Sequence, residues 1–466
     1  MAIRFYNTLS RQKEEFIPLQ PGKVGLYTCG PTVYNYVHVG NLRTFMFQDL
    51  LKKHLKFQGF SVSHVMNITD VEDKIIRTCR ETGESLQSLT DRYTEAFFDD
   101  LETLGIELPD HTPRATGYIE PMVDMIKTLR ERGHTYEVDG SVYFKIKSFE
   151  NYGKLSHFDV DTLQGGASGR VDSDEYETED VRDFALWKAY VEDDGDVFWE
   201  TEIGKGRPGW HLECSCMSMG LLGESFDIHC GGIDLVFPHH ENEIAQSEAA
   251  SGKPFVKYWL HAAHLNIAGQ KISKSLGNSI TLRSLLDEGH DPIAIRWVLR
   301  ATHYRQPSNF SEETLEAARQ SVQRVRDFRQ RLKEVSQTDG ENLQTICDSC
   351  ESTFKESLDD DLNISGALAA VFDFIKEVNR GLDQNTVGID GARNALALMD
   401  KLDTVTGLLG DAPAEEVPER ILEMVGQRQD ARRDKDFAKA DSIRDEMLDS
   451  GWILEDTPDG PRVKKA

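Results

Sequence analysis

A strand-to-helix junction near the N-terminus constrains the fold of this chain more than any other feature. Residues 24–29 form an apolar run of strand length, Gly30-Pro31 interrupts the pattern, and residues 42–57 carry apolar side chains at helical spacing. Strand-like runs return at residues 62–68, 225–229 and 258–267, with helical patterns between them. Short strands that alternate with helices predict a parallel α/β sheet, here split by an insertion.

The junction carries the segment His38-Val39-Gly40-Asn41. A glycine at this place lets a nucleotide approach the backbone, and both a helix N-terminus and an imidazole suit phosphate charge. A second segment, Lys271-Ile272-Ser273-Lys274-Ser275, offers two ammonium groups and two hydroxyls, which suit a pyrophosphate leaving group. Taken alone, a segment like the first is more often a simple turn, and a segment like the second is more often a solvated surface loop. In this order and context, the two segments predict an ATP site.

The two segments resemble the His-Ile-Gly-His and Lys-Met-Ser-Lys-Ser signatures of class I aminoacyl-tRNA synthetases. The resemblance narrows to the cysteinyl-tRNA synthetase family through Pro31-Thr32-Val33-Tyr34, Asn67-Ile68-Thr69-Asp70, Arg207-Pro208-Gly209-Trp210-His211 and Phe237-Pro238-His239-His240-Glu241-Asn242-Glu243. It covers nearly the whole chain. It implies that cysteine is activated with ATP to cysteinyl adenylate and then transferred to the 3′ terminal ribose of tRNA(Cys).

The resemblance also implies a set of site residues. The residues that stabilise phosphate charge in catalysis would be His38, Asn41, Lys271 and Lys274. ATP, as substrate with Mg²⁺, would be bound by His38, Gly40, Asn41, Lys271, Ser273, Lys274 and Ser275. The amino-acid pocket would be lined by Thr69, Trp210, His229 and Asp234, although His229 alone is more simply interpreted as a core histidine. Asn41 departs from the family signature, because its amide donates a hydrogen bond but cannot become cationic.

Four side chains can converge on one metal ion. Cys29 ends the first strand, and ligands bind at the carboxyl ends of parallel strands. His239 and Glu243 are four residues apart after a proline suited to begin a helix, so they would share one helical face. Cys214 would be flanked by the indole of Trp210, while helical geometry makes Cys216 and His240 poorer ligands than their neighbours. His-His-x-x-Glu and Cys-x-Cys patterns are also common in proteins without a metal site, where the buried cysteine acts as a small apolar side chain.

The resemblance implies one zinc ion per chain, held by Cys29, Cys214, His239 and Glu243. Zinc would select cysteine because it ionises a thiol and prefers the thiolate to a serine hydroxyl. Glu243, a hard oxygen ligand, would be the one to lengthen when the substrate sulfur arrives. The insertion is too short and acidic for an editing domain.

The composition favours a cytoplasmic enzyme. The first 15 residues are polar and mixed in charge, unlike a signal peptide, and no apolar run approaches the roughly 18 residues that span a membrane. Seven cysteines, an odd and unevenly spaced set, argue against a disulfide framework. Cys347-x-x-Cys350 matches no second pair, which disfavours a redox or metal role.

The charge bears on the tRNA partner. The chain has 80 Asp and Glu against 53 Lys and Arg, and its net charge of -27 repels nucleic acid as a mean field. A local basic track is predicted on one helix, with a solvated amphipathic helix as the alternative; its members are Arg319, Arg326, Arg329 and Lys333, with Arg324 and Arg331 beside them. The expected partners are tRNA(Cys), cysteine and ATP, without a membrane, and a monomer is expected.

The pattern divides into four parts. Residues 1–120 and 201–300 would form a class I catalytic Rossmann-like domain, with residues 121–200 as a connective insertion that includes an acidic surface loop at 164–183. Residues 301–410 would form a helical tRNA/anticodon-binding bundle with an apolar stripe from Ala367 to Val378. Residues 411–466 would form a linker and a small mixed α/β C-terminal module that ends in a hairpin.

Two other functions remain open. The first is the related ligase that joins cysteine to an amino sugar in mycothiol synthesis, which shares the zinc and ATP motifs but should lack an RNA-binding tail. The second is a non-catalytic RNA-binding or regulatory relative, which would be expected to lose signature lysines or zinc ligands. The long segment after Ser311 and the retained signature residues favour the tRNA ligase.

Overall fold

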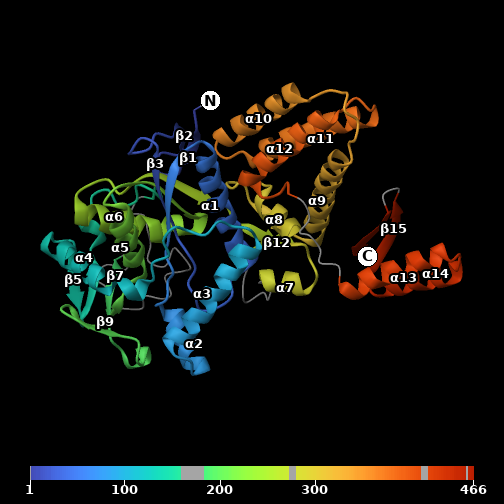
Figure 1. Ribbon diagram of the computed structural model, residues 1–466. Helices are drawn as coiled ribbons and strands as arrows, with labels where there is room; N and C mark the ends of the chain where they lie inside the picture. The colour runs from blue at the N-terminus through green and yellow to red at the C-terminus, as the bar shows by residue number, and fades with distance from the viewer. Residues whose placement is uncertain (1, 159–182, 272–279, 411–417, 458–459, 466) are drawn as a thin grey trace. The chain divides into compact units, whose positions relative to one another are not determined.

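The computed structural model describes residues 2–158, 183–271, 280–410, 418–457 and 460–465 (Figure 1). It divides into two compact units, Met1–Gly410 and Asp411–Ala466. The domain boundaries predicted within the first unit stay predictions. The acidic stretch at residues 164–182 lies outside the described residues, as do Ser273, Lys274 and Ser275.

The first unit is built on a four-stranded parallel sheet, as predicted. Its strand order is β11 (Val256–Ala262), β10 (Phe226–Gly232), β3 (Lys23–Thr28) and β4 (Ser61–Met66). The register places Leu26 beside Ile228, and all three strand pairs are parallel. The fold-class prediction of a Rossmann-like sheet is confirmed.

Helices cover both faces of this sheet, so its strands are apolar on both sides. Leu26, Ile228 and Leu260 pack in one core with Leu42 and Met46 of α1 (Val39–Phe57). Their neighbours Tyr27 and Trp259 belong to a second core with residues of α5 (Trp210–Leu222) and α6 (Glu241–Ser251). The alternation follows from the two-residue period of a strand.

An antiparallel sheet lies between β4 and β10 along the chain. It has the order β5 (Thr135–Val138), β6 (Ser141–Phe144), β7 (Phe184–Ala189), β9 (Gly204–Pro208) and β8 (Trp199–Thr201). Three helices precede it: α2 (Asp73–Thr82), α3 (Leu86–Thr103) and α4 (Ile119–Glu131). A hairpin of β1 (Arg4–Asn7) and β2 (Gln12–Glu15) opens the chain.

The strand-like run at residues 258–267 divides between two sheets. β11 ends at Ala262, and β12 (Leu265–Ile267) pairs with β13 (Gln270–Lys271) and β14 (Ser308–Phe310) in a small separate sheet. α7 (Leu282–Asp287) and α8 (Pro292–Arg300) follow. This break turns the chain from the parallel sheet toward the helices.

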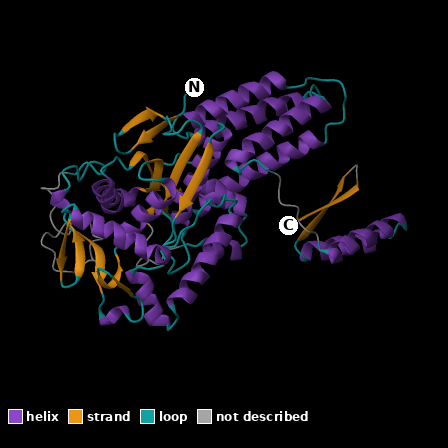
Figure 2. Ribbon diagram, turned by 60° about the vertical axis from the view of Figure 1, so that its left-hand side comes forward, coloured by secondary structure: helices purple, strands orange, loops and turns teal. Residues whose placement is uncertain are grey.

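The rest of the first unit is a bundle of α9 (Glu312–Lys333), α10 (Gln344–Asp359), α11 (Ile364–Asp383) and α12 (Ile389–Thr406), shown side by side in Figure 2. The predicted apolar stripe on α11 is buried except at Phe372, which is only partly covered. In the described parts of the chain, no helix has the length and hydropathy needed to cross a membrane.

The second unit combines α13 (Glu419–Arg433) and α14 (Phe437–Asp449) with the hairpin of β15 (Trp452–Thr457) and β16 (Gly460–Lys465). Its small core contains Ile421, Met424, Ile443, Met447, Trp452 and Leu454. Gly451 adopts φ +81° just after α14, a conformation that ends helices and favours glycine. The predicted mixed α/β module with a terminal hairpin is confirmed.

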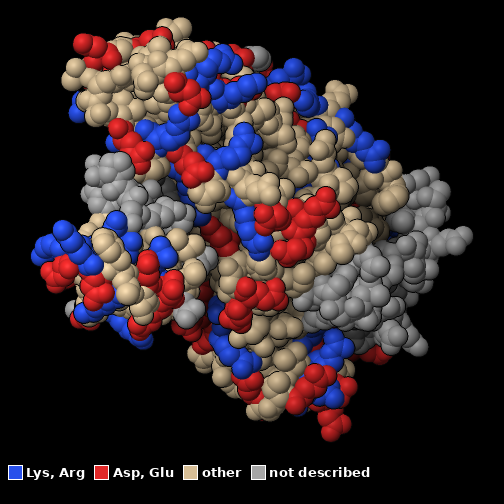
Figure 3. Space-filling model, turned by 90° about the vertical axis from the view of Figure 1, so that its right-hand side faces the viewer, with Lys and Arg blue, Asp and Glu red and all other residues tan. Residues whose placement is uncertain are grey.

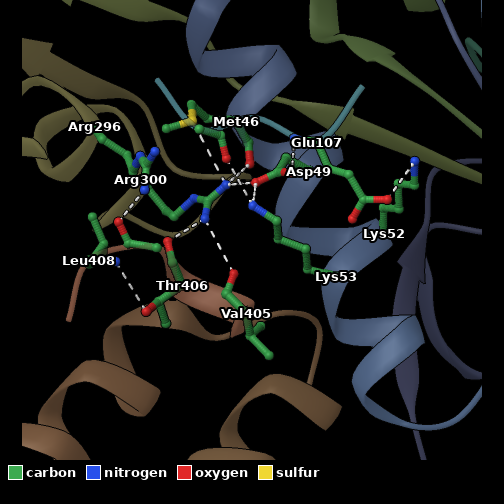
Figure 4. A network of polar contacts seen from close by, with 12 residues as sticks. Met46, Asp49, Lys52, Lys53, Glu107, Arg296, Arg300, Val405, Thr406 and Leu408 are labelled. Carbon is green, nitrogen blue, oxygen red and sulfur yellow. Dashed lines mark hydrogen bonds and ion pairs between the residues drawn. The ribbon is translucent and has the colours of Figure 1, made fainter. Parts of the chain in front are cut away.

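A buried polar network joins α1 to the bundle (Figure 4). The guanidinium group of Arg300, on α8, is ion-paired with Asp49 of α1 and donates to the carbonyls of Val405 (3.3 Å) and Thr406 at the end of α12. Arg296 donates to the carbonyl of Gly407. Because carbonyls at a helix C-terminus carry partial negative charge, these cations hold the last turn of α12 against α8 and α1.

We predict that Asp49→Asn destabilises the first unit by roughly 3–5 kcal/mol, since it leaves the Arg300 charge buried without its anion. Burial opposes ionisation of Asp49, but Arg300 and Lys53 hold its pKa below the usual value. The ionised Asp49 therefore adds to the free energy of unfolding above a pH of about 4. This contribution is lost as the pH falls through the lowered pKa that Asp49 has in the folded protein. Equilibrium urea unfolding at several pH values measures it.

The matched control is Arg393→Gln, which removes an exposed ion pair with Asp390 on α12 and should change stability by less than about 1 kcal/mol. Equal effects of the two substitutions would contradict the role assigned to the buried network.

Candidate active site and metal centre

The first signature segment caps helix α1. The backbone N–H of Asn41 donates to His38 Nδ1 (3.2 Å), and the N–H of His38 donates to Asn41 Oδ1 (3.4 Å). Asn41 therefore plays the part that Glu or Gln usually takes in a capping box. The residue that departs from the family signature thus helps to fix the start of α1 by satisfying N–H groups that a helix start leaves without partners.

The structure places the first signature segment against residues 280–281, which follow the second signature segment in the chain. The N–H of Val39 donates to the carbonyl of Ile280 (2.9 Å), and His38 forms an antiparallel bridge with Thr281, the N-cap of α7. Lys271 ends β13, where it pairs with Asn266. The structure describes only the backbone of Lys271, and the segment from there to Ile280 lies outside the described residues. The end of this segment at Ile280 therefore contacts the N-terminus of α1.

The four predicted metal ligands meet at one point. One sulfur, nitrogen or oxygen atom from each of Cys29, Cys214, His239 and Glu243 lies within 4.8 Å of all the others. Cys29 directly follows β3, Cys214 lies on α5, and Glu243 lies on α6, one turn beyond His239. The four side chains therefore gather where the carboxyl end of β3 meets α5 and α6. The carboxyl ends of parallel strands are where such sheets bind ligands.

Two buried histidines fix the orientation of these ligands. His211 Nδ1 lies 2.8 Å from Nδ1 of His239, and His229 Nε2 lies 2.9 Å from Oε2 of Glu243. His239 Nε2 lies 3.1 Å from the other oxygen of Glu243. Hydrogen bonds of this kind select the tautomer and the ring orientation of a metal ligand. His211 was not predicted as a site residue, although it lies within one of the segments that carry the family resemblance.

The electrostatics of the cluster suit a cation. Hydrogen bonding with Cys29 lowers the pKa of Cys214 to about 6. Burial opposes charge on Glu243, but His229 and His239 lower its pKa to about 2. Burial also opposes charge on His239, but Glu243 and Cys214 raise its pKa to about 10. These shifts favour positive charge between Cys214 and Glu243, and two thiols, an imidazole and a carboxylate fit Zn²⁺.

The prediction that His240 is a poorer ligand by position stays a prediction, although this side chain also lies at the cluster. Its Nε2 lies 3.3 Å from Cys29 Sγ, and a second set of possible ligands consists of Cys29, His229, His240 and Glu243. The backbone is non-helical at Phe237 (φ -138°, ψ 134°), before the two histidines, whereas His240 itself has helical backbone angles. His240 Nδ1 in turn lies 2.8 Å from His261 on β11. Cys216, by contrast, lies against Met125 of α4.

The residues predicted for the amino-acid pocket differ in accessibility. Trp210 is 39 % exposed, and its ring packs on His239 with centroids 4.2 Å apart. Thr69 is buried, accepts from Asn67 Nδ2 (3.1 Å) and donates to Glu213 (3.1 Å). His229 is fully buried behind Glu243. Asp234 follows β10 in a short turn. Trp210 and Asp234 are thus the more open members of this set.

The basic track on α9 is largely neutralised. Arg326 is paired with Asp291 (2.8 Å), Arg329 is buried and paired with Asp400 (2.7 Å), and Arg331 is paired with Asp383 (2.5 Å). Figure 3 shows lysines and arginines next to acidic side chains over much of the face that it draws. These contacts favour the alternative of a solvated, ion-paired helix over a continuous basic track.

Comparisons with known proteins agree with this geometry. A family model described as the class I (C) tRNA synthetase catalytic domain matches residues 15–320, and one described as the DALR domain matches residues 353–410. A protein named cysteine–tRNA ligase from Protochlamydia amoebophila is 49% identical over 99% of this chain and 98% of its own length. Another of that name, from Chlamydia trachomatis, is 50% identical over the full length of both chains.

Solved structures show the same fold. A Mycobacterium tuberculosis methionyl-tRNA synthetase in complex with methionyl-adenylate aligns with a TM-score of 0.61 at 15% identity, covering 84% of this chain and 94% of that one. A putative arginyl-tRNA synthetase from Campylobacter jejuni aligns with a TM-score of 0.51 at 14% identity, covering 85% of this chain and 94% of that one. These likenesses concern the fold alone.

We predict that Cys214→Ser lowers zinc affinity sharply, because it replaces a thiolate ligand with a hydroxyl. His229→Phe keeps the ring but removes the hydrogen bond to Glu243, and should lower affinity roughly 10- to 100-fold. Competition with a chromophoric chelator measures both. Cys216→Ser is the matched control, since its sulfur faces α4; a loss as large as that of Cys214→Ser would refute the ligand assignment.

Proposed function

Because the chain belongs to the cysteine–tRNA ligase family of class I aminoacyl-tRNA synthetases, we propose that it charges tRNA(Cys) with cysteine. Cysteine and ATP form cysteinyl adenylate and pyrophosphate. The cysteinyl group then passes to a hydroxyl of the 3′ terminal ribose, and AMP leaves. The observation that carries the proposal is the buried cluster of two thiols, an imidazole and a carboxylate, in a chain that also has the capped signature segment at the start of α1.

The selection of cysteine is assigned to one zinc ion per chain held by Cys29, Cys214, His239 and Glu243. When bound, zinc supplies a Lewis acid that ionises a thiol and prefers it to a hydroxyl. Around it, His211 and His229 hold His239 and Glu243 in place. Trp210 closes the exposed side over His239, and the carboxylate of Asp234 is suited to the substrate ammonium group.

The chemistry of adenylation needs no nucleophilic side chain. Positioning of the cysteine carboxylate beside the α-phosphate and stabilisation of the leaving pyrophosphate are sufficient. The N-terminus of α1, with His38 and Gly40, faces the phosphates of ATP, which arrives with Mg²⁺. Lys271 and Lys274, with Ser273 and Ser275, neutralise charge on the pyrophosphate. Asn41 contributes by holding His38 at the cap, since their hydrogen bonds are reciprocal.

The tRNA is the second substrate in this proposal. The DALR domain and the second unit follow the catalytic part, which favours a tRNA ligase over a ligase for an amino sugar. The retained metal ligands disfavour a non-catalytic relative. We assign the reaction to a monomer in the cytoplasm.

The direct test is cysteine-dependent exchange between ATP and pyrophosphate, followed by charging of tRNA(Cys). Exchange with cysteine but not with serine supports the proposal, whereas exchange that is independent of cysteine would overturn it.

Within that assay, Lys274→Ala should lower the exchange rate by roughly two to three orders of magnitude, the scale of losing one preorganised donor to a developing charge. Circular dichroism and the urea midpoint should remain those of the wild type. Lys13→Ala, which removes an exposed pair with Asp360, is the control for loss of a lysine. Exchange kinetics unaffected by Lys274→Ala would remove this lysine from the mechanism.

A further inference from the structure

An exposed aromatic residue stands beside the ATP signature without a role in it. Tyr36 lies two residues before His38 and is 43% exposed. Its neighbours Val33 and Val37 are buried, and the N–H of Val33 donates to the carbonyl of Thr69 (3.1 Å). The backbone of residues 33–37 is therefore held in place at both ends, and the partly exposed ring of Tyr36 extends from it.

Two side chains from other elements pack against this ring, and a third packs against one of those two. Tyr93 of α3 meets it edge-on, with centroids 5.2 Å apart and planes at 86°. The guanidinium group of Arg283, on α7, lies 5.2 Å from the centroid of Tyr36, and that of Arg92 lies 4.7 Å from the centroid of Tyr93. We call Arg92, Tyr93, Tyr36 and Arg283 the aromatic–arginine ladder.

The two arginines are held in place by their own partners. Arg283 donates to the carbonyl of Ala96 (2.9 Å) and lies 3.4 Å from Asp100, while Arg92 is paired with Glu84 (3.0 Å). Because both charges are already paired, the ladder is weakly attractive to phosphate. What it offers is a set of fixed planar groups, and fixed aromatic rings with guanidinium planes are what proteins use to stack unpaired bases.

We propose that the ladder binds the unpaired 3′-terminal nucleotides of tRNA by stacking a base against Tyr36. This inference rests on the proposed function, in which the terminal ribose must reach an adenylate formed at the start of α1. Tyr36 is exposed and lies two residues before His38, the N-cap of α1, so a base stacked on it would lie next to the terminal nucleotide that carries the reacting ribose. The ladder takes no part in bond making: the ribose oxygen attacks the cysteinyl carbonyl, and AMP leaves, within the site itself.

The proposed stacking predicts different effects of a Tyr36 substitution on adenylation and on tRNA charging. Tyr36→Ala should lower kcat/KM for tRNA charging by about tenfold, the scale of one lost base stack, and should leave pyrophosphate exchange within about twofold of wild type. Tyr36→Phe keeps the ring and should charge tRNA normally. Because stacking rather than charge carries the contact, the defect should be similar at low and high salt. Ile17→Ala, at a side chain 56% exposed, is the control for loss of an apolar surface group.

A second measurement reads stacking without catalysis. Full-length tRNA(Cys) is prepared with 2-aminopurine at each of its three terminal positions in turn, and its fluorescence is titrated with the zinc-loaded protein. At one position at least, the wild type and Tyr36→Phe should quench the fluorescence and Tyr36→Ala should not.

Equal quenching by all three proteins, or a parallel loss of exchange and charging in Tyr36→Ala, would overturn the assignment. A wild type that binds and quenches the tRNA but shows no cysteine-dependent exchange would instead overturn the proposed function and leave the ladder supported.

Discussion

A buried carboxylate beside two thiols requires positive charge, and the catalytic half of this structure is arranged around that requirement. Glu243 is fully buried between His229 and His239, and Cys29 and Cys214 complete the same shell. Burial alone would keep the carboxyl neutral, yet the surrounding rings lower its pKa to about 2. The ionised carboxylate that these rings stabilise is a ligand that a divalent metal ion can bind. The helices α5 and α6, the end of β3 and a kinked turn at Phe237 are the elements that hold it.

Helix α1 connects this centre to the rest of the first unit. Its N-terminus carries the first signature segment, and Val39 there bonds to Ile280, which follows the second signature segment in the chain. Its middle carries Asp49, whose partner Arg300 also holds the last carbonyls of the bundle. A single helix therefore contributes to both the first signature segment and the attachment of the bundle.

The sequence predicted what depends on regular geometry. Alternating apolar runs predicted the parallel sheet, and the position of Cys29 after a strand and the four-residue spacing of His239 and Glu243 predicted side chains that do meet. What it missed depends on distant partners. His240 contacts Cys29, which is 211 residues away along the chain, so no local pattern indicates this contact. Arg329 was assigned to a basic track because its partner, Asp400, is contributed by a distant helix. Asn41 appeared only as a departure from a signature, whereas its bond to His38 shows a capping role.

The central claim is that a metal ion at this cluster recognises the substrate by its sulfur. X-ray absorption at the zinc edge tests it most directly, because it counts the sulfur atoms bound to the metal. The account predicts two sulfur ligands in the zinc-loaded protein, three after cysteine is added, and two after serine is added. A sulfur count that stays at two with saturating cysteine, or a first shell without the two protein thiolates, would contradict the account.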